Sequence, residues 1–241
     1  MASLFDNTRD LDDIGEIYRR MHTNCPNPAS TSAHLWRLQR KPDISPYNTS
    51  AEKMLEKAVA ILAERGHMQG WFNQCSTASG IGGPRMDRRR NVDLVSWNAP
   101  DRYAALVELK WQSDSASEAL RQVIGYGAAY VFGRMHRDKL PLQHRPVMDA
   151  RHVSLQVVAP AHYCRATDLA GCLDRARQGL RHFDIGSRIR QLSMSIDVLA
   201  LPDWFELPFA NGDDVLANCD REVLTEPGRM IRDAFRAARP V

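Results

Sequence analysis

The sequence lacks a long hydrophobic run. Its longest nearly uncharged, mostly apolar stretch, Val123 to Gly133, is far shorter than the ~18–20 residues that cross a bilayer. The acidic segment from Asp6 to Asp13 has neither the basic nor the apolar region of a signal peptide. We therefore expect a soluble protein of the cytoplasm that has no membrane partner.

Paired cysteines and several familiar motifs are also missing. The five cysteines are odd in number and form no Cys-x-x-Cys pair, which argues against a disulfide scaffold and a zinc ribbon. His22, Cys25 and His34 lack a fourth zinc ligand at suitable spacing. No Gly-x-Ser-x-Gly elbow occurs, and the glycine-rich stretch from Ser79 to Pro84 has no Gly-Lys-Ser/Thr ending. Reduced structural thiols are expected, without a serine nucleophile or a nucleotide loop.

The composition is that of a globular protein. The 241 residues are 44% hydrophobic and 25% charged, enough to bury a sizeable core, and the net charge is only +3. We expect an N-terminal helical appendage over residues 1–48, with helices at Leu11–His22 and Ser32–Gln39. A single domain over residues 49–241 is expected to follow.

The periodicity of this domain predicts an α/β fold. An amphipathic helix is predicted from an N-cap at Ser50, or Thr49, to a glycine cap at Gly66. A second helix begins at Ser115 or Ser117 and runs to Tyr130. The predicted strands are Gly70–Asn73, Asn91–Trp97, Tyr103–Trp111, Val153–Ala159 and Met194–Leu201, and later helices are predicted at Ala166–Leu180 and Pro227–Ala238.

Charged residues interrupt the otherwise apolar pattern of the predicted hairpin. Side chains two apart on a strand share a face, so Glu108 and Lys110 point the same way. If the hairpin turns about Pro100 and Asp101, the residue numbers of each cross-strand pair add up to about 201. This rule places Asp93 opposite Glu108. Two carboxylates and one ammonium would then converge on one spot.

This combination suits phosphodiester hydrolysis. Two carboxylates form a hard-oxygen site for Mg²⁺ or Mn²⁺, which lowers the pKa of an attacking water and offsets charge on the phosphate. Lys110 would hold the water in line and add positive charge. The alternative without a function is that Glu108 and Lys110 form a solvated ion pair on an edge strand.

The acidic residue on one strand and the Glu-x-Lys on the next resemble the signature of the PD-(D/E)xK nuclease superfamily. Val92 stands where that family has its proline. The family also tends to carry a glutamate on the preceding helix; Glu56 is favoured for this role, with Glu52 as the substitute. Gln122 and Tyr126 match the QxxxY pattern of the recombination-nuclease and λ-exonuclease branches. The resemblance covers about residues 50–130.

The resemblance implies a restriction-endonuclease-like core, with a mixed central β-sheet flanked by helices. It further implies a Mg²⁺-dependent (or Mn²⁺-dependent) nuclease whose partner is nucleic acid, with double-stranded DNA favoured, and it allows a homodimer because many relatives cut duplexes as dimers. Asp93 and Glu108 would bind the metal directly and Glu56 through water. Lys110 would orient the water, and Gln122 and Tyr126 would support the site.

A basic cluster precedes the hairpin and could contact a phosphate backbone, or could simply be a basic surface loop. It consists of Arg85, Arg88, Arg89 and Arg90. The tryptophans at 71, 97, 111 and 204 are expected to pack, although one could stack on a base. Two other functions stay open: a catalytically inactive nuclease-fold protein for nucleic-acid binding or assembly, and an unrelated α/β domain.

Overall fold

A computed structural model describes residues 14–24, 35–77, 91–112, 115–140, 142, 145–166, 169–183, 185 and 189–241. Its centre is a six-stranded sheet in which neighbouring strands follow chain order. The strands are β1 (Trp71–Ser76), β2 (Asn91–Asn98), β3 (Tyr103–Leu109), β4 (His152–Pro160), β5 (Ser193–Leu201) and β6 (Arg239–Pro240). The first three strands are antiparallel, β3, β4 and β5 are parallel, and β6 is antiparallel to β5. The predicted α/β class and mixed sheet are confirmed.

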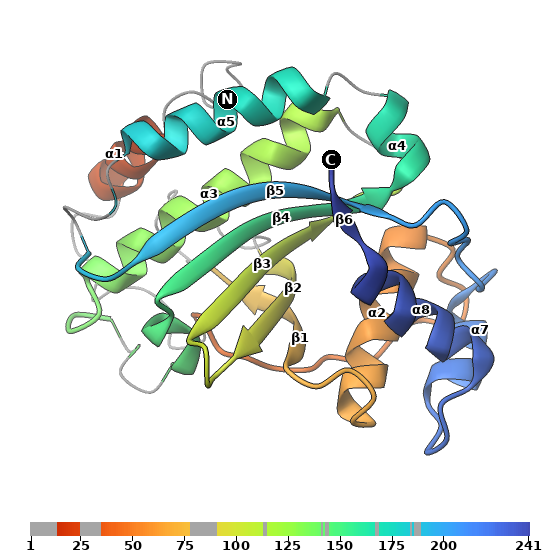
Figure 1. Cartoon of the computed structure of the whole chain (residues 1–241). Coiled ribbons are helices and arrows are strands. Elements are labelled where there is room, and N and C mark those ends of the chain that lie inside the picture. The colour runs from red at the N-terminus through yellow and green to blue at the C-terminus, as the bar shows by residue number, and fades with distance from the viewer. Residues whose placement is uncertain are drawn as a thin grey trace.

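Helices cover both faces of the sheet (Figure 1). One face packs on α1 (Ile14–Asn24), α3 (Ala116–Met135) and α5 (Leu169–His182). The other packs on α2 (Ala51–Glu64), α7 (Gly212–Cys219) and α8 (Glu226–Ala237). The alternation of β3 divides its side chains between these two cores, with Leu106 in the first and Ala105 and Val107 in the second. The short helices η3 (Pro146–Asp149) and α4 (Ala161–Ala166) precede and follow β4.

The predicted caps position the two helices nearest the charged hairpin. Ser50 caps α2, because its side chain accepts a hydrogen bond from the Lys53 N–H, and Gly66 follows the helix with a φ of +82°. Ser115 caps α3 in the same way through the Glu118 N–H. Helix α3 runs on past the predicted Tyr130 to Met135.

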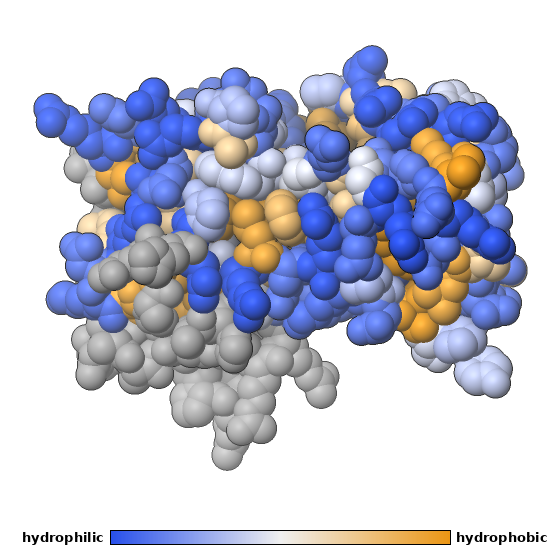
Figure 2. All heavy atoms as spheres, turned by 90° about the horizontal axis from the view of Figure 1, so that it is seen from below, coloured by the Kyte–Doolittle hydropathy of each residue, from blue (hydrophilic) through white to orange (hydrophobic). Residues whose placement is uncertain are grey.

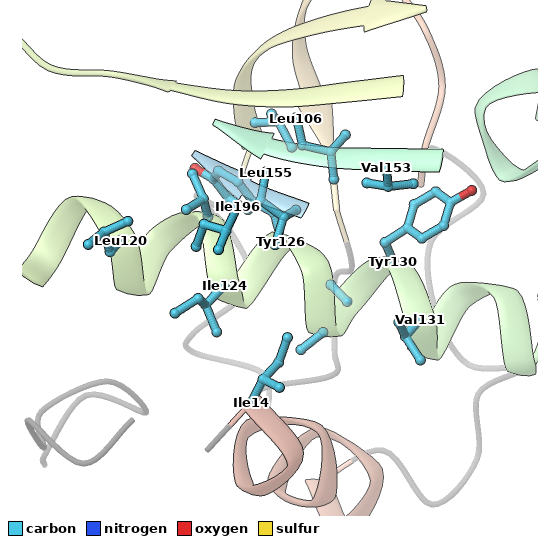
Figure 3. Packing of buried hydrophobic residues seen from close by; sticks show 14 of the residues in the cluster. Ile14, Leu106, Leu120, Ile124, Tyr126, Tyr130, Val131, Val153, Leu155 and Ile196 are labelled. Carbon is cyan, nitrogen blue, oxygen red and sulfur yellow. The ribbon is translucent and has the colours of Figure 1, made fainter. Parts of the chain in front are cut away.

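Helix α3 lies between the sheet and α1. Figure 3 shows Leu106, Leu155 and Ile196 of the strands on one side of α3 and Ile14 of α1 on the other. Gly127 permits this close packing, since a Cβ there would meet the Leu155 side chain at 2.7 Å. Tyr126 and Tyr130 lie on the sheet-facing side of the same helix (Figure 3).

The predicted hairpin and its register are confirmed. The ladder between β2 and β3 pairs Leu94 with Val107 and Val95 with Leu106, as expected from a turn about Pro100 and Asp101. Strand β3 is central, between β2 and β4, so the reading of Glu108 and Lys110 as an edge-strand pair is wrong. Both residues are buried.

The second helix predicted for the appendage, Ser32–Gln39, is not formed in residues 35–39, the part of it that the structure describes. Residues 35–36 form a turn and residues 37–45 have no helical structure. Their backbone instead follows the outer edge of β1, where Trp36 N–H donates to Ser76 O and Asn73 N–H donates to Gln39 O. The exposed hydrogen-bonding groups of an edge strand thus outcompete the local helix propensity.

Several elements differ from the prediction in extent or number. The predicted helix Ala166–Leu180 is observed as α5, which begins at Leu169, whereas α4 before it was not predicted, and β1 extends three residues beyond Asn73. Helix α7 and the two-residue β6 were not predicted. The division at residue 48 stays a prediction, but Ile14 and Ile17 of the appendage are buried against the main core.

The surface seen from below carries mostly hydrophilic residues, with hydrophobic residues gathered in separate patches (Figure 2). No helix among the described residues is long and apolar enough to cross a membrane. The four described cysteines, Cys75, Cys164, Cys172 and Cys219, are buried and form no disulfide.

Candidate active site

The charged residues of the hairpin meet where β2 begins and β3 ends. The β2–β3 ladder stops at the Leu94–Val107 pair, next to the predicted Asp93–Glu108 pair. There the Asp93 carboxylate, through Oδ2, accepts a hydrogen bond from the backbone N–H of Leu109 at 3.0 Å. A side chain therefore replaces a main-chain acceptor and brings the carboxylate to the end of β3.

An irregularity in two strands aims Asp93 at this point. The ladder between β1 and β2 pairs Asn73 with Leu94 and Cys75 with Val92, and it skips Gln74 and Asp93. Gln74 has a left-handed backbone with φ +51°. Beyond Asp93 the alternation of β2 shifts, because Val92 packs on the α3 side although Leu94 packs on the α2 side. This local irregularity changes the direction in which the side chains of β2 point on either side of Asp93.

Glu108 is held by two donors. Lys110 Nζ lies 3.1 Å from Glu108 Oε1, and the Tyr126 hydroxyl donates to Glu108 Oε2 at 2.6 Å. The same hydroxyl lies 3.1 Å from the carbonyl oxygen of Asn91 at the start of β2. Tyr126 of α3 thereby links the two strands of the site.

The two carboxylates carry more negative charge than their surroundings neutralise. Burial raises the pKa of Asp93 well above its ordinary value, and the nearby Glu108 charge raises it further. Burial also raises the pKa of Glu108, although Lys110 and the Tyr126 hydroxyl oppose that shift. Two acids that repel each other beside one ammonium are a place where a further cation would be stabilised.

Glu56 lies close enough to Asp93 to raise its pKa, but its own carboxylate is already surrounded by donors. Lys53 Nζ lies 2.6 Å from Oε2, Asn73 Nδ2 donates to Oε1 at 2.6 Å, and Lys57 Nζ lies 3.6 Å from Oε1. Glu52, the substitute, accepts the Trp111 N–H at 2.9 Å and contributes to the raised pKa of Glu108. The choice between the two glutamates thus stays open.

Asn73 is a residue that sequence reasoning missed. It is fully buried on β1, and besides Glu56 it contacts the backbone of Lys41, accepting its N–H at 2.7 Å and donating to its carbonyl at 3.0 Å. A buried amide in a strand was the available signal, because such a group must find partners.

Gln122 lies one helical turn before Tyr126 on α3. Its Oε1 is buried and accepts no hydrogen bond from the part of the chain that the structure describes. An unpaired buried oxygen is costly, so a donor from outside these residues, such as a ligand or a water, would be favoured there. The basic cluster of Arg85, Arg88, Arg89 and Arg90 lies outside the described residues.

A cavity of about 310 Å³ opens beside the site. It is lined by the start of α2 and the end of β3, with Glu52 and Trp111 among its walls. Its complete lining is Thr49, Ser50, Ala51, Glu52, Trp111 and Gln112. Trp111 follows Lys110 directly in the chain, so the cavity lies close to the charged end of β3.

The donor set fits a hard divalent cation that completes its coordination shell with water. Within the described residues no three His, Cys, Asp or Glu side chains are grouped to hold a metal ion. Two carboxylates, Asp93 and Glu108, nevertheless suffice for Mg²⁺, which is usually bound by one or two carboxylates and keeps several waters. Burial raises the pKa of both acids, and a cation held between them would oppose these shifts.

Comparison of the chain with protein-family models, with curated proteins and with solved structures finds no match. The assignment of function therefore depends on the geometry of the site alone.

Proposed function

We propose that this protein hydrolyses phosphodiester bonds, in DNA by preference, with the help of Mg²⁺ or Mn²⁺. In this proposal it is a nuclease of the PD-(D/E)xK type with a restriction-endonuclease-like core. One observation carries the proposal: the Asp93 and Glu108 carboxylates and the Lys110 ammonium converge at one end of β2 and β3.

Each residue of the site has a chemical role in the proposed reaction. Asp93 and Glu108 hold the divalent cation, which when bound lowers the pKa of a water and neutralises charge on the phosphate. Lys110 orients the attacking water, whose oxygen bonds to phosphorus as the bond to the leaving oxygen breaks. Tyr126 fixes the orientation of Glu108. Gln122 accepts a hydrogen bond from a bound water or substrate.

The surrounding fold supports this proposal independently of the charges. A glutamate-bearing helix, α2, precedes the three antiparallel strands, and α3 follows the lysine and returns Tyr126 to the site. Parallel β4 lies next to β3, so that Lys110 N–H donates to Val158 O at the end of β3. The catalytic end of β3 is thereby held in the interior of the sheet.

The alternative is a nuclease-fold protein that binds or assembles on nucleic acid without cutting it. Loss of catalysis removes the reason to keep buried charges that oppose folding. Here Asp93, Glu108 and Lys110 are all retained and converge, which favours the active enzyme.

The test compares cleavage by the wild type with that by Lys110→Met. Methionine fills the buried volume of the lysine stem but carries no charge. The matched control is Lys139→Met, a substitution of an exposed lysine beyond the end of α3. Circular duplex, linear duplex and single-stranded DNA, and RNA, are incubated with each protein in Mg²⁺, Mn²⁺ or chelator. Thermal unfolding shows that each variant is folded.

We expect the wild type and Lys139→Met to cut DNA only with the divalent ion. Lys110→Met should cut roughly 10²–10⁴-fold more slowly, the usual contribution of a positioned group that moves or holds a proton. Equal cleavage by folded Lys110→Met would reject the assignment of Lys110. Binding of DNA by the wild type without any cleavage in either metal would favour the inactive alternative.

A further inference from the structure

Aromatic side chains follow the carboxyl ends of all three parallel strands. Trp111 comes after β3, His162 after β4, and Trp204 and Phe205 after β5. Because parallel strands end at one edge of a sheet, these residues gather on the side of Lys110, where α2 and α4 lie (Figure 1). We call these four residues the aromatic row.

The rings of the aromatic row touch in sequence. Trp111 packs edge-on against His162, with ring centres 6.5 Å apart, and against Phe205 at 6.1 Å. Trp204 packs edge-on against Phe205 at 6.2 Å. A continuous aromatic path therefore runs from the residue after Lys110 to the surface.

The row is anchored at one end and exposed at the other. Phe205 is buried in the core on the α2 side, whereas 54% of Trp204 is exposed. In the described part of the chain, the only other exposed large aromatic side chain is Tyr47, which lies two residues before the lining of the cavity beside the site. Exposure of a tryptophan on a rigid aromatic support is typical of a surface that binds a flat ring.

Two cations, each paired with a carboxylate, lie near the row. Arg165 of α4 is 67% exposed and pairs at 2.8 Å with Asp203, the neighbour of Trp204. Exposed pairs of this kind contribute little stability, so Arg165 can exchange Asp203 for a phosphate at low cost. Lys53, 36% exposed and paired with Glu56, provides a second ammonium on α2, one residue after the Glu52 that accepts the Trp111 N–H.

We propose that the exposed end of the aromatic row, at Trp204, stacks on unpaired bases of the nucleic-acid strand that is cut at Asp93, Glu108 and Lys110. The proposal rests on the proposed nuclease function and specifies its substrate: a strand that is single-stranded, or frayed, beside the scissile phosphate. Stacking on aromatic rings accepts every base, so a preference for unpaired strands is expected rather than a preference for sequence.

The test measures binding without cleavage. Fluorescence anisotropy in chelator reports the affinity for three labelled probes of about 20 nucleotides each: single-stranded DNA, the same strand with abasic sites, and a blunt duplex. The variants are Trp204→Ala and Trp204→Phe, and the control is Val223→Ala, which removes an exposed apolar side chain outside the row. Thermal unfolding confirms that each variant is folded.

Trp204→Ala should weaken binding of the single strand roughly 5- to 100-fold, the range of one lost base–aromatic stack. Trp204→Phe should recover most of that affinity, and Val223→Ala should change it little. The abasic strand should respond weakly to Trp204→Ala, because it offers phosphates without bases.

Unchanged affinity of Trp204→Ala for the single strand would overturn the base-stacking proposal, even if the wild type cuts DNA with Mg²⁺. An equal loss on the abasic strand would overturn it too, since the row would then act on the backbone. If the wild type failed to cut but showed the expected Trp204 dependence, the nuclease proposal would fail while base binding stood.

Discussion

Two groups of buried charges lie side by side in this protein, and they are balanced differently. In the first, which we call the α2 group, the single carboxylate of Glu56 faces donors from Lys53, Lys57 and Asn73. In the second, the strand group, the carboxylates of Asp93 and Glu108 share one ammonium, that of Lys110, while Tyr126 donates to Glu108.

The comparison shows that burial alone does not identify a functional site. Lys57 is as buried as Lys110, yet it completes a set of hydrogen bonds: it donates to the carbonyl oxygen of Lys41 at 2.5 Å and lies beside Glu56. Burial lowers the pKa of Lys57, but the Glu56 charge opposes that shift and the hydrogen bonds are made, so the α2 group holds the fold together. In the strand group both acids have raised pKa values, because burial and mutual repulsion are not fully offset. The excess of negative charge over positive charge, rather than burial, is the feature that favours cation binding in the strand group.

Substitution of Lys57 tests the α2 group, and it has the largest expected effect on the free energy of unfolding. Lys57→Met removes a donor from the Lys41 carbonyl and a counter-charge from Glu56, both in a buried setting. Breaking a buried pair from one side costs about 3 kcal/mol of folding free energy. Urea denaturation measures the loss.

The control for that experiment is the neighbouring Lys53→Met. Lys53 contacts the same carboxylate, but 36% of its side chain is exposed and water can replace it. Its loss should cost less than about 1 kcal/mol. If the two variants were equally stable, the α2 group would not depend on its buried member and the contrast between the groups would disappear.

Removal of the Tyr126 hydroxyl tests how tightly the strand group is positioned. Tyr126→Phe takes away the donor to Glu108 Oε2, leaving the carboxylate less constrained. Partners that orient a metal ligand typically contribute 10- to 100-fold, so Mn²⁺ affinity and cleavage rate should fall roughly tenfold. Calorimetric Mn²⁺ titration and the cleavage assay provide the two measurements.

Tyr130→Phe is a matched control on the same helix. Tyr130 donates to the Val147 carbonyl at 2.8 Å, away from the strand group, so its loss should lower stability by about 1 kcal/mol without changing Mn²⁺ affinity. Loss of Mn²⁺ affinity in both variants would mean that α3 packing, rather than the Tyr126 hydroxyl, positions Glu108.

The strand group could be predicted from sequence because its geometry is local. A two-strand hairpin with a recognisable turn fixes which residues face each other, and the register of Leu94 with Val107 followed from that rule. Ser50, Gly66 and Tyr126 were likewise placed by caps and helical spacing.

The surroundings of the site could not be predicted, because they depend on contacts between segments far apart in the chain. Asn73 meets Glu56 only because residues 36–41 run along β1, a path that the local sequence, read as a helix, did not indicate. The shift of strand alternation at Asp93 depends on the backbone of Gln74 in the neighbouring strand. The aromatic row requires the order of β3, β4 and β5 in the sheet.

One expected change in stability has the opposite sign to the others. Asp93→Asn should abolish cleavage yet stabilise the metal-free fold at neutral pH by about 1 kcal/mol, since it removes a charge that burial and Glu108 disfavour. The amide cannot repel Glu108. The control is Asp197→Asn, which should not stabilise the protein, because the Asp197 carboxylate pairs with Arg177 at 2.9 Å.

The pH dependence follows from the direction of the Asp93 shift. The folded-state pKa lies above the unfolded value of about 3.8, so between these two pKa values the folded protein binds more protons than the unfolded chain. Stability of the metal-free wild type should therefore be highest at low pH within this window and should fall as the pH rises through the raised pKa. Asp93→Asn should show a smaller slope in urea denaturation over the same range, and saturating Mn²⁺ should stabilise the wild type but not the variant. A steeper fall in the variant would contradict the charge imbalance on which the contrast with the α2 group depends.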